Sequence, residues 1–159
     1  MKKTIEWYRC KGPAPQERIE FVSKEVGIIF PESFVALMQE CDGGRPEITC
    51  FEYTSRSMAS EIGTGIGSFL GFGETPDNYD LLGYYHDPSE FFPEGLVAFA
   101  DTGGGDYICF DYRLGKTNPD PEIVYWEHGA EEGNDICFVA KNFDAFMAML
   151  HPFDESLLK

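Results

Sequence analysis

Lysine and arginine are missing from two long parts of this sequence. None occurs between Arg56 and Arg113 or between Lys116 and Lys141, although both parts carry many Asp and Glu residues. The whole chain has a formal net charge of −16. Binding to a nucleic-acid backbone or to anionic lipid requires clustered basic side chains, so we expect no direct nucleic-acid partner and no membrane partner.

Long apolar runs are also missing. No run approaches the roughly 18 residues of a membrane-spanning helix. The start Met1-Lys2-Lys3 resembles that of a signal peptide, but Glu6 and Arg9 interrupt the apolar segment that such a peptide needs. The sequence therefore predicts a cytoplasmic location.

The cysteines do not form a recognisable motif. Their number, five, is odd, and no pair has the CxxC spacing of a metal or redox site. We expect reduced and mostly buried thiols, as is usual for a cytosolic protein. The cysteines are Cys10, Cys41, Cys50, Cys109 and Cys137.

Catalytic signatures are scarce as well. Nucleophilic catalysis needs a Cys or Ser beside a His and an orienting acid, and the chain has only three histidines. A small hydrolase using Glu127, His128 or Cys109 is the enzyme alternative. Because Cys109 lies in an apolar strand pattern, we expect a core thiol there, and we predict that the protein is not an enzyme.

No sequence motif requires a metal or cofactor. The best acidic group, Glu127-His128 with Glu131-Glu132, lacks HExxH spacing, so we expect a solvated acidic turn. Residues 63–67 are glycine-rich but carry no phosphate-binding lysine, which indicates a flexible connection. We interpret Asp111 as a carboxylate at a strand end that accepts backbone N–H groups of the following turn.

The residues that are present predict three amphipathic helices. Apolar residues recur at helical spacing from about Gln16 to Val26, from Pro31 to Cys41, and from Asn142, an N-cap, to Leu150. Residues 78–86 are expected to form a short helix with three apolar side chains inward. These side chains are Leu81, Leu82 and Tyr85.

Strand patterns fill much of the remaining sequence. Alternating or continuous apolar residues predict strands at 48–53, 68–72, 96–100, 107–112 and 123–128. The short Gly- and Pro-containing connections favour antiparallel pairing of the last three. We therefore predict an α+β fold in a single domain, residues 1–159, with an antiparallel sheet and helices packed on part of it.

Acidic and aromatic residues are interleaved in the region without bases. Acids steer a basic partner, and exposed aromatic side chains supply contact area. Because loops commonly carry recognition, we expect the partner to bind residues 77–91, with the loop 101–106 as a second candidate. The candidate binding residues are Asp77, Asp80, Tyr84, Asp87, Glu90 and Asp106.

Five ordered segments resemble the SUKH superfamily, the Smi/Knr-like group. The first runs from the helix entry Phe30-Pro31-Glu32 to the turn Asp42-Gly43-Gly44 and resembles "LP…F…NGG". The others resemble "FP.GLIPFA", "GDYLCFD", "PVVYWDHE" and "VA.SFEEFL". These segments are residues 92–100, 105–111, 123–128 and 140–146.

The resemblance covers about residues 16–150 and implies an α+β fold without known catalysis. Bacterial members of the group are commonly immunity proteins that neutralise a toxin of a polymorphic or contact-dependent system, and fungal relatives regulate cell-wall synthesis. We therefore expect a protein-binding domain whose partner is a basic toxin domain such as a nuclease. A regulatory adaptor without a toxin partner is the alternative, and the oligomeric state is left open.

Overall fold

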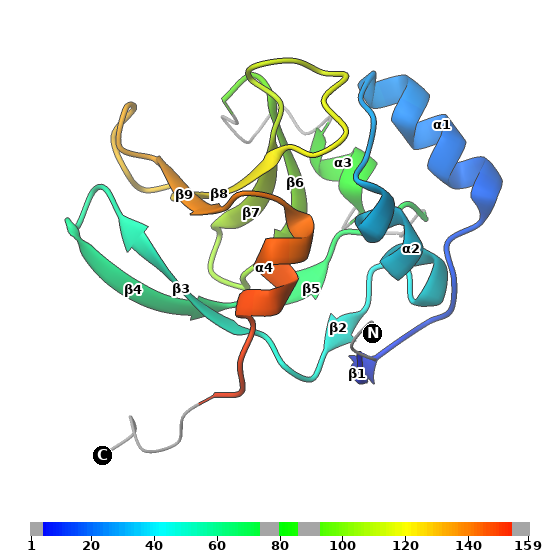
Figure 1. The fold of residues 1–159 in the computed structure, drawn as a ribbon, viewed down its shortest axis with the longest axis horizontal. Helices are drawn as coiled ribbons and strands as arrows, with labels where there is room; N and C mark the ends of the chain where they lie inside the picture. The colour runs from blue at the N-terminus through cyan, green and yellow to red at the C-terminus, as the bar shows by residue number, and fades with distance from the viewer. Residues whose placement is uncertain (1–4, 74–79, 86–92, 154–159) are drawn as a thin grey trace.

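The computed structural model describes residues 5–73, 80–85 and 93–153, and they form a mixed α+β fold (Figure 1). Short strands and helices alternate at the start, and a longer run of strands precedes the last helix. The elements are β1 (Trp7–Arg9), α1 (Gln16–Val26), α2 (Glu32–Glu40), β2 (Arg45–Pro46), β3 (Cys50–Ser55), β4 (Ser60–Gly65), β5 (Ser68–Phe69), α3 (Leu81–Tyr85), β6 (Leu96–Asp101), β7 (Tyr107–Asp111), β8 (Glu122–Trp126), β9 (Ile136–Ala140) and α4 (Phe143–Met149).

The main sheet has five strands in the order β5-β6-β7-β8-β9, and every neighbouring pair is antiparallel. The predicted antiparallel arrangement of the three central strands is confirmed. β3 and β4 form a separate two-stranded sheet, as do β1 and β2. The fold class predicted from the sequence is therefore correct.

A β-bulge interrupts the pairing of β6 with β7. Ala98 pairs with Cys109 and Ala100 pairs with Ile108, which leaves Phe99 as the extra residue. A bulge of this kind shifts the alternation of side chains by one residue. Ala100 therefore shares a face of the sheet with Ile108, and Asp101 shares the opposite face with Tyr107.

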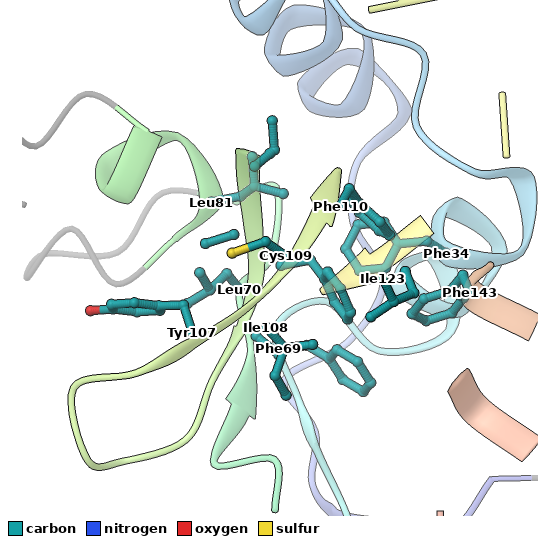
Figure 2. Packing of buried hydrophobic residues seen from close by; sticks show 14 of the residues in the cluster. Phe34, Phe69, Leu70, Leu81, Tyr107, Ile108, Cys109, Phe110, Ile123 and Phe143 are labelled. Atoms are coloured by element: carbon teal, nitrogen blue, oxygen red, sulfur yellow. The ribbon is translucent and has the colours of Figure 1, made fainter. Parts of the chain in front are cut away.

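Both faces of the sheet are buried, which explains the continuous apolar runs of β6, β7 and β8. On one face Phe110 packs against Phe34 of α2 and Phe143 of α4, with ring centroids 5.1 and 6.1 Å away. The other face carries Cys109 and Tyr107 and is covered by α3 with Leu81 (Figure 2), and Tyr107 packs on Tyr84 of this helix with ring centroids 4.9 Å apart. The helices thus cover two sides of one sheet.

The helices begin and end largely where the sequence predicts. Gly27, in the left-handed conformation, ends α1, and Asn142 caps α4 by accepting a hydrogen bond from the Ala145 N–H. Pro31 precedes α2 as its N-cap instead of being its first residue. In α3 the prediction is partly wrong, because Leu81 is buried whereas Tyr85 is exposed.

Four strands were not predicted, namely β1, β2, β4 and β9. β4 occupies the glycine-rich segment that the sequence suggested to be a flexible connection, and β9 precedes α4. Two other strands differ in extent, because β3 begins two residues later than expected and β5 ends at Phe69. Pairing with a neighbouring strand, rather than local preference, stabilises β4.

The Asp42-Gly43-Gly44 turn connects α2 to a distant loop. The Asp42 carboxylate accepts hydrogen bonds from the backbone N–H groups of Phe72 and Gly73, at 2.7 and 2.8 Å. A side chain at Gly44 would lie 2.5 Å from the Cys41 sulfur, so this position has no room for a Cβ atom. The turn therefore requires both the carboxylate and the small residue.

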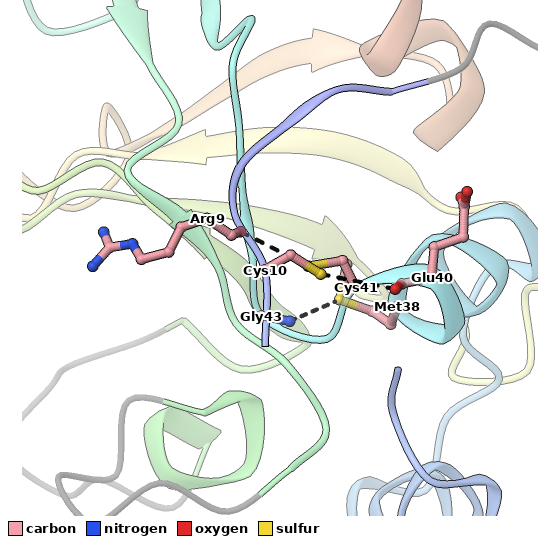
Figure 3. The surroundings of a disulfide bond; sticks show 6 residues. All are labelled: Arg9, Cys10, Met38, Glu40, Cys41 and Gly43. Atoms are coloured by element: carbon pink, nitrogen blue, oxygen red, sulfur yellow. Dashed lines mark hydrogen bonds between the residues drawn. A yellow bond between two sulfur atoms is a disulfide. The ribbon is translucent and has the colours of Figure 1, made fainter. Parts of the chain in front are cut away.

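One expectation about the cysteines is wrong. Cys10 and Cys41 form a disulfide that joins the segment after β1 to the end of α2 (Figure 3). Beside it, the Gly43 N–H donates a hydrogen bond to the Met38 sulfur at 3.4 Å. The 31-residue separation explains why no sequence motif revealed the pair. Cys109 and Cys137 are free and buried, as expected, and Cys50 is free and half-buried.

Candidate functional site

A cluster of hydrogen-bonded polar side chains lies at the end of β8. Glu127, the residue after β8, is 8% exposed, and its carboxylate accepts hydrogen bonds from three hydroxyl groups. The donors are Tyr53 at 2.5 Å, Ser55 at 2.8 Å and Ser57 at 2.7 Å. A buried carboxylate needs such partners. Because the donors lie in β3 and the turn that follows it, their hydrogen bonds to Glu127 link the β3–β4 hairpin to the main sheet.

Tyr53 is held as a neutral donor in this cluster. Burial raises the pKa of its phenol well above the usual value, and the hydrogen bond to Glu127 raises it further. The Tyr53 ring also stacks on the Tyr125 ring, with centroids 4.1 Å apart. The aromatic contact and the hydrogen bond together fix the position of the hairpin.

Asp106 forms a second polar centre on the other side of Tyr125. Its carboxylate accepts a hydrogen bond from the Tyr125 hydroxyl at 2.9 Å and from the His128 backbone N–H at 3.0 Å. The His128 ring Nδ1 also lies 3.0 Å from it. Burial, with smaller effects of Asp106, raises the pKa of Tyr125 to about 12.

A row of rings runs past these acids. Tyr84 of α3 packs on Tyr107, Tyr107 packs on Trp126, and Trp126 packs on His128, with centroid distances of 4.9, 6.2 and 6.3 Å. The Trp126 indole N–H donates to Asp135 at 3.1 Å. Two acids, Asp106 and Asp135, thus flank a row that extends from α3 to the end of β8.

A hollow opens beside Trp126. Its volume is about 670 Å³, and its lining includes His128, Glu132 and Asp135 as well as two arginines. One of these, Arg113, is held by both oxygens of Asp111 at 2.9 Å. Most of the row is buried, so the accessible part of this surface is mainly the His128 edge and the acidic loop between β8 and β9.

The structure describes three of the six predicted binding residues. Asp106 lies at the surface edge, with 26% of its side chain exposed. Tyr84 contacts Tyr107, the neighbour of Asp106, so α3 and the 101–106 loop lie together. Asp80 is 5% exposed and accepts the Gly83 N–H. The remaining three, Asp77, Asp87 and Glu90, lie outside the described residues.

Sequence reasoning did not identify Tyr53, Ser55, Trp126 and Asp135 as parts of this site. The predicted strand 48–53 places Tyr53 on the same face as Phe51, but it could not show Glu127 as the partner of Tyr53. The expectation of a solvated acidic turn is wrong for Glu127, which is buried, and agrees with the exposed Glu131 and Glu132.

The other predicted chemical groups have structural roles where the structure describes them. Asp111 accepts the Arg113 backbone N–H at 3.0 Å, as expected for a carboxylate at a strand end. Cys109 is fully buried, and burial raises the pKa of its thiol well above the usual value. Among the described residues, no three His, Cys, Asp or Glu side chains are grouped to hold a metal ion.

Comparison with known proteins identifies the family. Within the described residues, no helix has both the length and the apolar character needed to cross a membrane. A search of curated proteins gives no match. The model of the SMI1/KNR4 family (SUKH-1) matches residues 13–149, which is most of the chain. Together with the α+β fold, this match shows that the protein belongs to the SMI1/KNR4 (SUKH-1) family.

Proposed function

We propose that this protein is an immunity protein that binds and neutralises a toxin of a polymorphic or contact-dependent system. The observation that carries the proposal is the family match over residues 13–149, because SUKH proteins commonly have this role. Proteins of the family generally act without catalysis. The mode of action is therefore binding, with the toxin blocked by the contact itself.

The charge of the chain supports a basic partner. A net charge of −16 produces a field that attracts a basic domain, such as a nuclease with a positively charged substrate cleft. The acidic loop that ends at Asp135 lines the hollow beside Trp126, and Asp106 contacts His128, another residue of that lining. We propose that this surface and the predicted residues of the 77–91 segment other than the buried Asp80 contact the partner.

Co-expression with the neighbouring toxin domain tests the function. Cells that produce the toxin domain should survive when they also produce this protein, and the two chains should co-purify as a complex. A variant that fails to fold would give the same result as a protein without this function, so circular dichroism should accompany each variant. Neither rescue nor complex formation with the folded wild type would reject the immunity function. A stable complex with a non-toxin protein would instead favour a regulatory adaptor.

Charge reversal tests the binding surface. We expect Asp87→Lys with Glu90→Lys to lower the association rate and the salt dependence of binding, with little effect on dissociation. Asp80 is unsuitable for this test because it is buried and accepts the Gly83 N–H. The control reverses two exposed acids of α1, Glu17 and Glu25. Equal effects of both double variants would mean that total charge, and not this surface, steers the encounter.

We also propose that the protein acts in the cytoplasm. Disulfides are rare there, so Cys10 and Cys41 are expected to be thiols for most of the time in that compartment. Trapping of free thiols with an alkylating reagent during cell lysis, followed by mass spectrometry, measures this directly. A fully oxidised pair in cells would contradict the cytoplasmic location.

A further inference from the structure

The outer edge of β4 has backbone groups without a backbone partner among the described residues. The Ile66 N–H donates to the Thr49 carbonyl at 3.1 Å, so Ile66 faces the β3 side of this strand. Since residues alternate along a strand, Thr64 and Ile62 also face β3. Their neighbours Glu61, Gly63 and Gly65 must then direct their N–H and C=O groups to the opposite edge.

The same edge is paired where the chain continues. The Gly67 N–H, which follows the same alternation as Gly63 and Gly65, donates to the Asp101 carbonyl at 2.8 Å. Preceding Gly67, β4 pairs with β3 and with no other strand in the described structure. The open edge therefore begins where the pairing with Asp101 ends, and it lies at the rim of the molecule (Figure 1).

β4 lacks the features that normally protect an edge strand. It is six residues long and pairs with β3 in an uninterrupted register, without a bulge. It contains no proline and no lysine, which proteins commonly use to prevent pairing at an edge. An unprotected edge of this kind is suited to receiving another strand.

Two glycines make the edge accessible to another backbone. A side chain at Gly63 would meet a single atom within 4 Å, a Glu52 carboxylate oxygen at 3.9 Å, so packing inside the protein does not require glycine there. Neither Gly63 nor Gly65 has a positive φ. Glycine inside a strand often marks a close approach of another backbone, and here no such backbone is present among the described residues.

The charged side chains beside this edge indicate which kind of added strand would be attracted to it. Glu52 and Glu61 lie on the outer face of the β3–β4 hairpin, because Phe51 and Tyr53 occupy the buried face. No lysine or arginine lies within β3 or β4; Arg56 follows β3 directly, and His151 Nε2 lies 2.7 Å from the Glu52 carboxylate. A second copy of this chain would bring another Glu61 and another charge of −16, whereas a basic strand would be attracted.

We propose that β4 binds an extended, basic segment of a partner protein, which adds a third strand to the β3–β4 sheet. The backbone groups of Glu61, Gly63 and Gly65 pair with the added strand. Lysine or arginine side chains at alternate positions of that strand contact Glu61, and Glu52, which also contacts His151, adds negative charge on the same face. This inference rests on the proposed binding function and deepens it by naming the conformation and charge of the bound segment.

A synthetic peptide tests the proposal without the toxin. The probe is a peptide of about eight residues that alternates lysine with threonine, with blocked ends, a length typical of a strand. We expect it to slow amide exchange at Gly63 and Gly65 by about tenfold at saturation, with no change in β6 and β7. A peptide alternating glutamate with threonine serves as the charge control. Equal binding of the two peptides, or no protection of β4, would overturn the proposal.

Substitutions at Gly63 separate backbone pairing from charge. Gly63→Pro removes the outward N–H without removing a hydrogen bond to β3, so we expect the lysine peptide to bind about tenfold more weakly or not at all. Gly63→Ala keeps the N–H and should bind within about twofold of the wild type. Glu61→Lys should weaken binding about fivefold, and Glu17→Lys on α1 should not.

The outcomes distinguish this inference from the proposed function. Toxin neutralisation without peptide binding would reject the β4 site alone. Concentration-dependent dimers with protected β4 amides would show that a second copy occupies the edge, which also rejects the basic segment. Equal peptide affinity of Gly63→Pro and Gly63→Ala, both with wild-type exchange in β6 and β7, would show that the backbone of β4 does not take part.

Discussion

The β6–β7 hairpin and the β3–β4 hairpin are both antiparallel, yet they are embedded differently. β6 and β7 have a neighbouring strand on each side and apolar side chains on both faces. The β3–β4 hairpin buries one face, places acids on the other, and leaves one edge open among the described residues. The same local pairing thus provides rigidity in the first hairpin and an accessible surface in the second.

The attachment of the two hairpins also differs in chemistry. Phe99 and Phe110 of the first hairpin stack with centroids 4.3 Å apart inside a cluster of phenylalanines. The second hairpin is also attached by a buried ring, because Phe51 packs on Phe146 with centroids 5.1 Å apart, but at one end Tyr53 and Ser55 donate hydrogen bonds to Glu127 as well. Hydrophobic burial therefore holds the first hairpin, whereas the second combines hydrophobic burial with polar contacts to a distant part of the chain.

The largest expected effect is in the first hairpin. Phe110→Ala should lower the free energy of unfolding by about 3–5 kcal/mol, because it removes a fully buried ring from a packed cluster. Urea denaturation measures the change. Phe138→Ala on β9 is the control, since this ring is 57% exposed, and its effect should stay within about 0.5 kcal/mol. Similar losses in both variants would contradict the distinction between core and surface.

Glu127→Gln should act mainly on the second hairpin. The substitution places an NH₂ group opposite a hydroxyl donor, and we expect a loss of about 1–3 kcal/mol. Amide exchange should accelerate in β3 and β4 more than in β6 and β7. The exposed Glu132→Gln in the same loop is the matched control. Uniform acceleration across the sheet would show that Glu127 supports the whole fold and not the hairpin attachment.

Alkaline pH should also affect the second hairpin through Tyr53. Burial raises the pKa of Tyr53 in the folded protein, so its contribution to stability is present below the unfolded pKa of 10.0. This contribution is lost as the pH rises through the folded pKa. The stability difference between wild type and Tyr53→Phe should therefore narrow above about pH 10. A difference that stays constant up to the alkaline unfolding of the protein would count against this role.

Acidic pH should affect the first hairpin through Asp111, with the smallest effect. Burial alone would raise the pKa of Asp111, but hydrogen bonds from the Arg113 side chain and backbone lower it overall. Its contribution to stability is present above the unfolded pKa of 3.8 and is lost as the pH falls through the folded pKa. Urea denaturation measures the difference in the free energy of unfolding between the wild type and Asp111→Asn. This difference should narrow below about pH 3.8. A widening difference would contradict the assigned direction.

The sequence predicted the first hairpin well and the second poorly. Continuous apolar runs define β6 and β7 regardless of their partners. Most of β4, in contrast, consists of glycine, serine and threonine, which carry little strand signal, and its structure depends on pairing with β3. β9 was missed because it lies next to the closing helix, and its apolar residues fit either kind of element.

The site was predictable only in outline. The excess of acids among aromatic residues led to the hypothesis of a recognition surface, which stays a prediction, and Asp106 lies in a loop as expected. The partners of Glu127, however, lie far earlier in the chain at Ser57, Ser55 and Tyr53, which are 70, 72 and 74 positions away. Contacts over such separations arise from the arrangement of the two sheets, which local patterns do not encode. The Cys10–Cys41 pair was missed for the same reason.

The bulge at Phe99 reverses the alternation of side chains between the two faces of β6. Before the bulge, Val97 faces the phenylalanine cluster and Ala98 lies on the opposite face, toward α3. After the bulge, the even-numbered Ala100 lies on the face of the cluster and Asp101 on the opposite face. A one-residue deletion here would keep the strand but exchange the surroundings of Asp101, whose carbonyl anchors Gly67 at the end of the open edge of β4. The single extra residue thus determines where the chain after β4 pairs with the main sheet. It therefore also determines how much of the β4 edge is open to another protein.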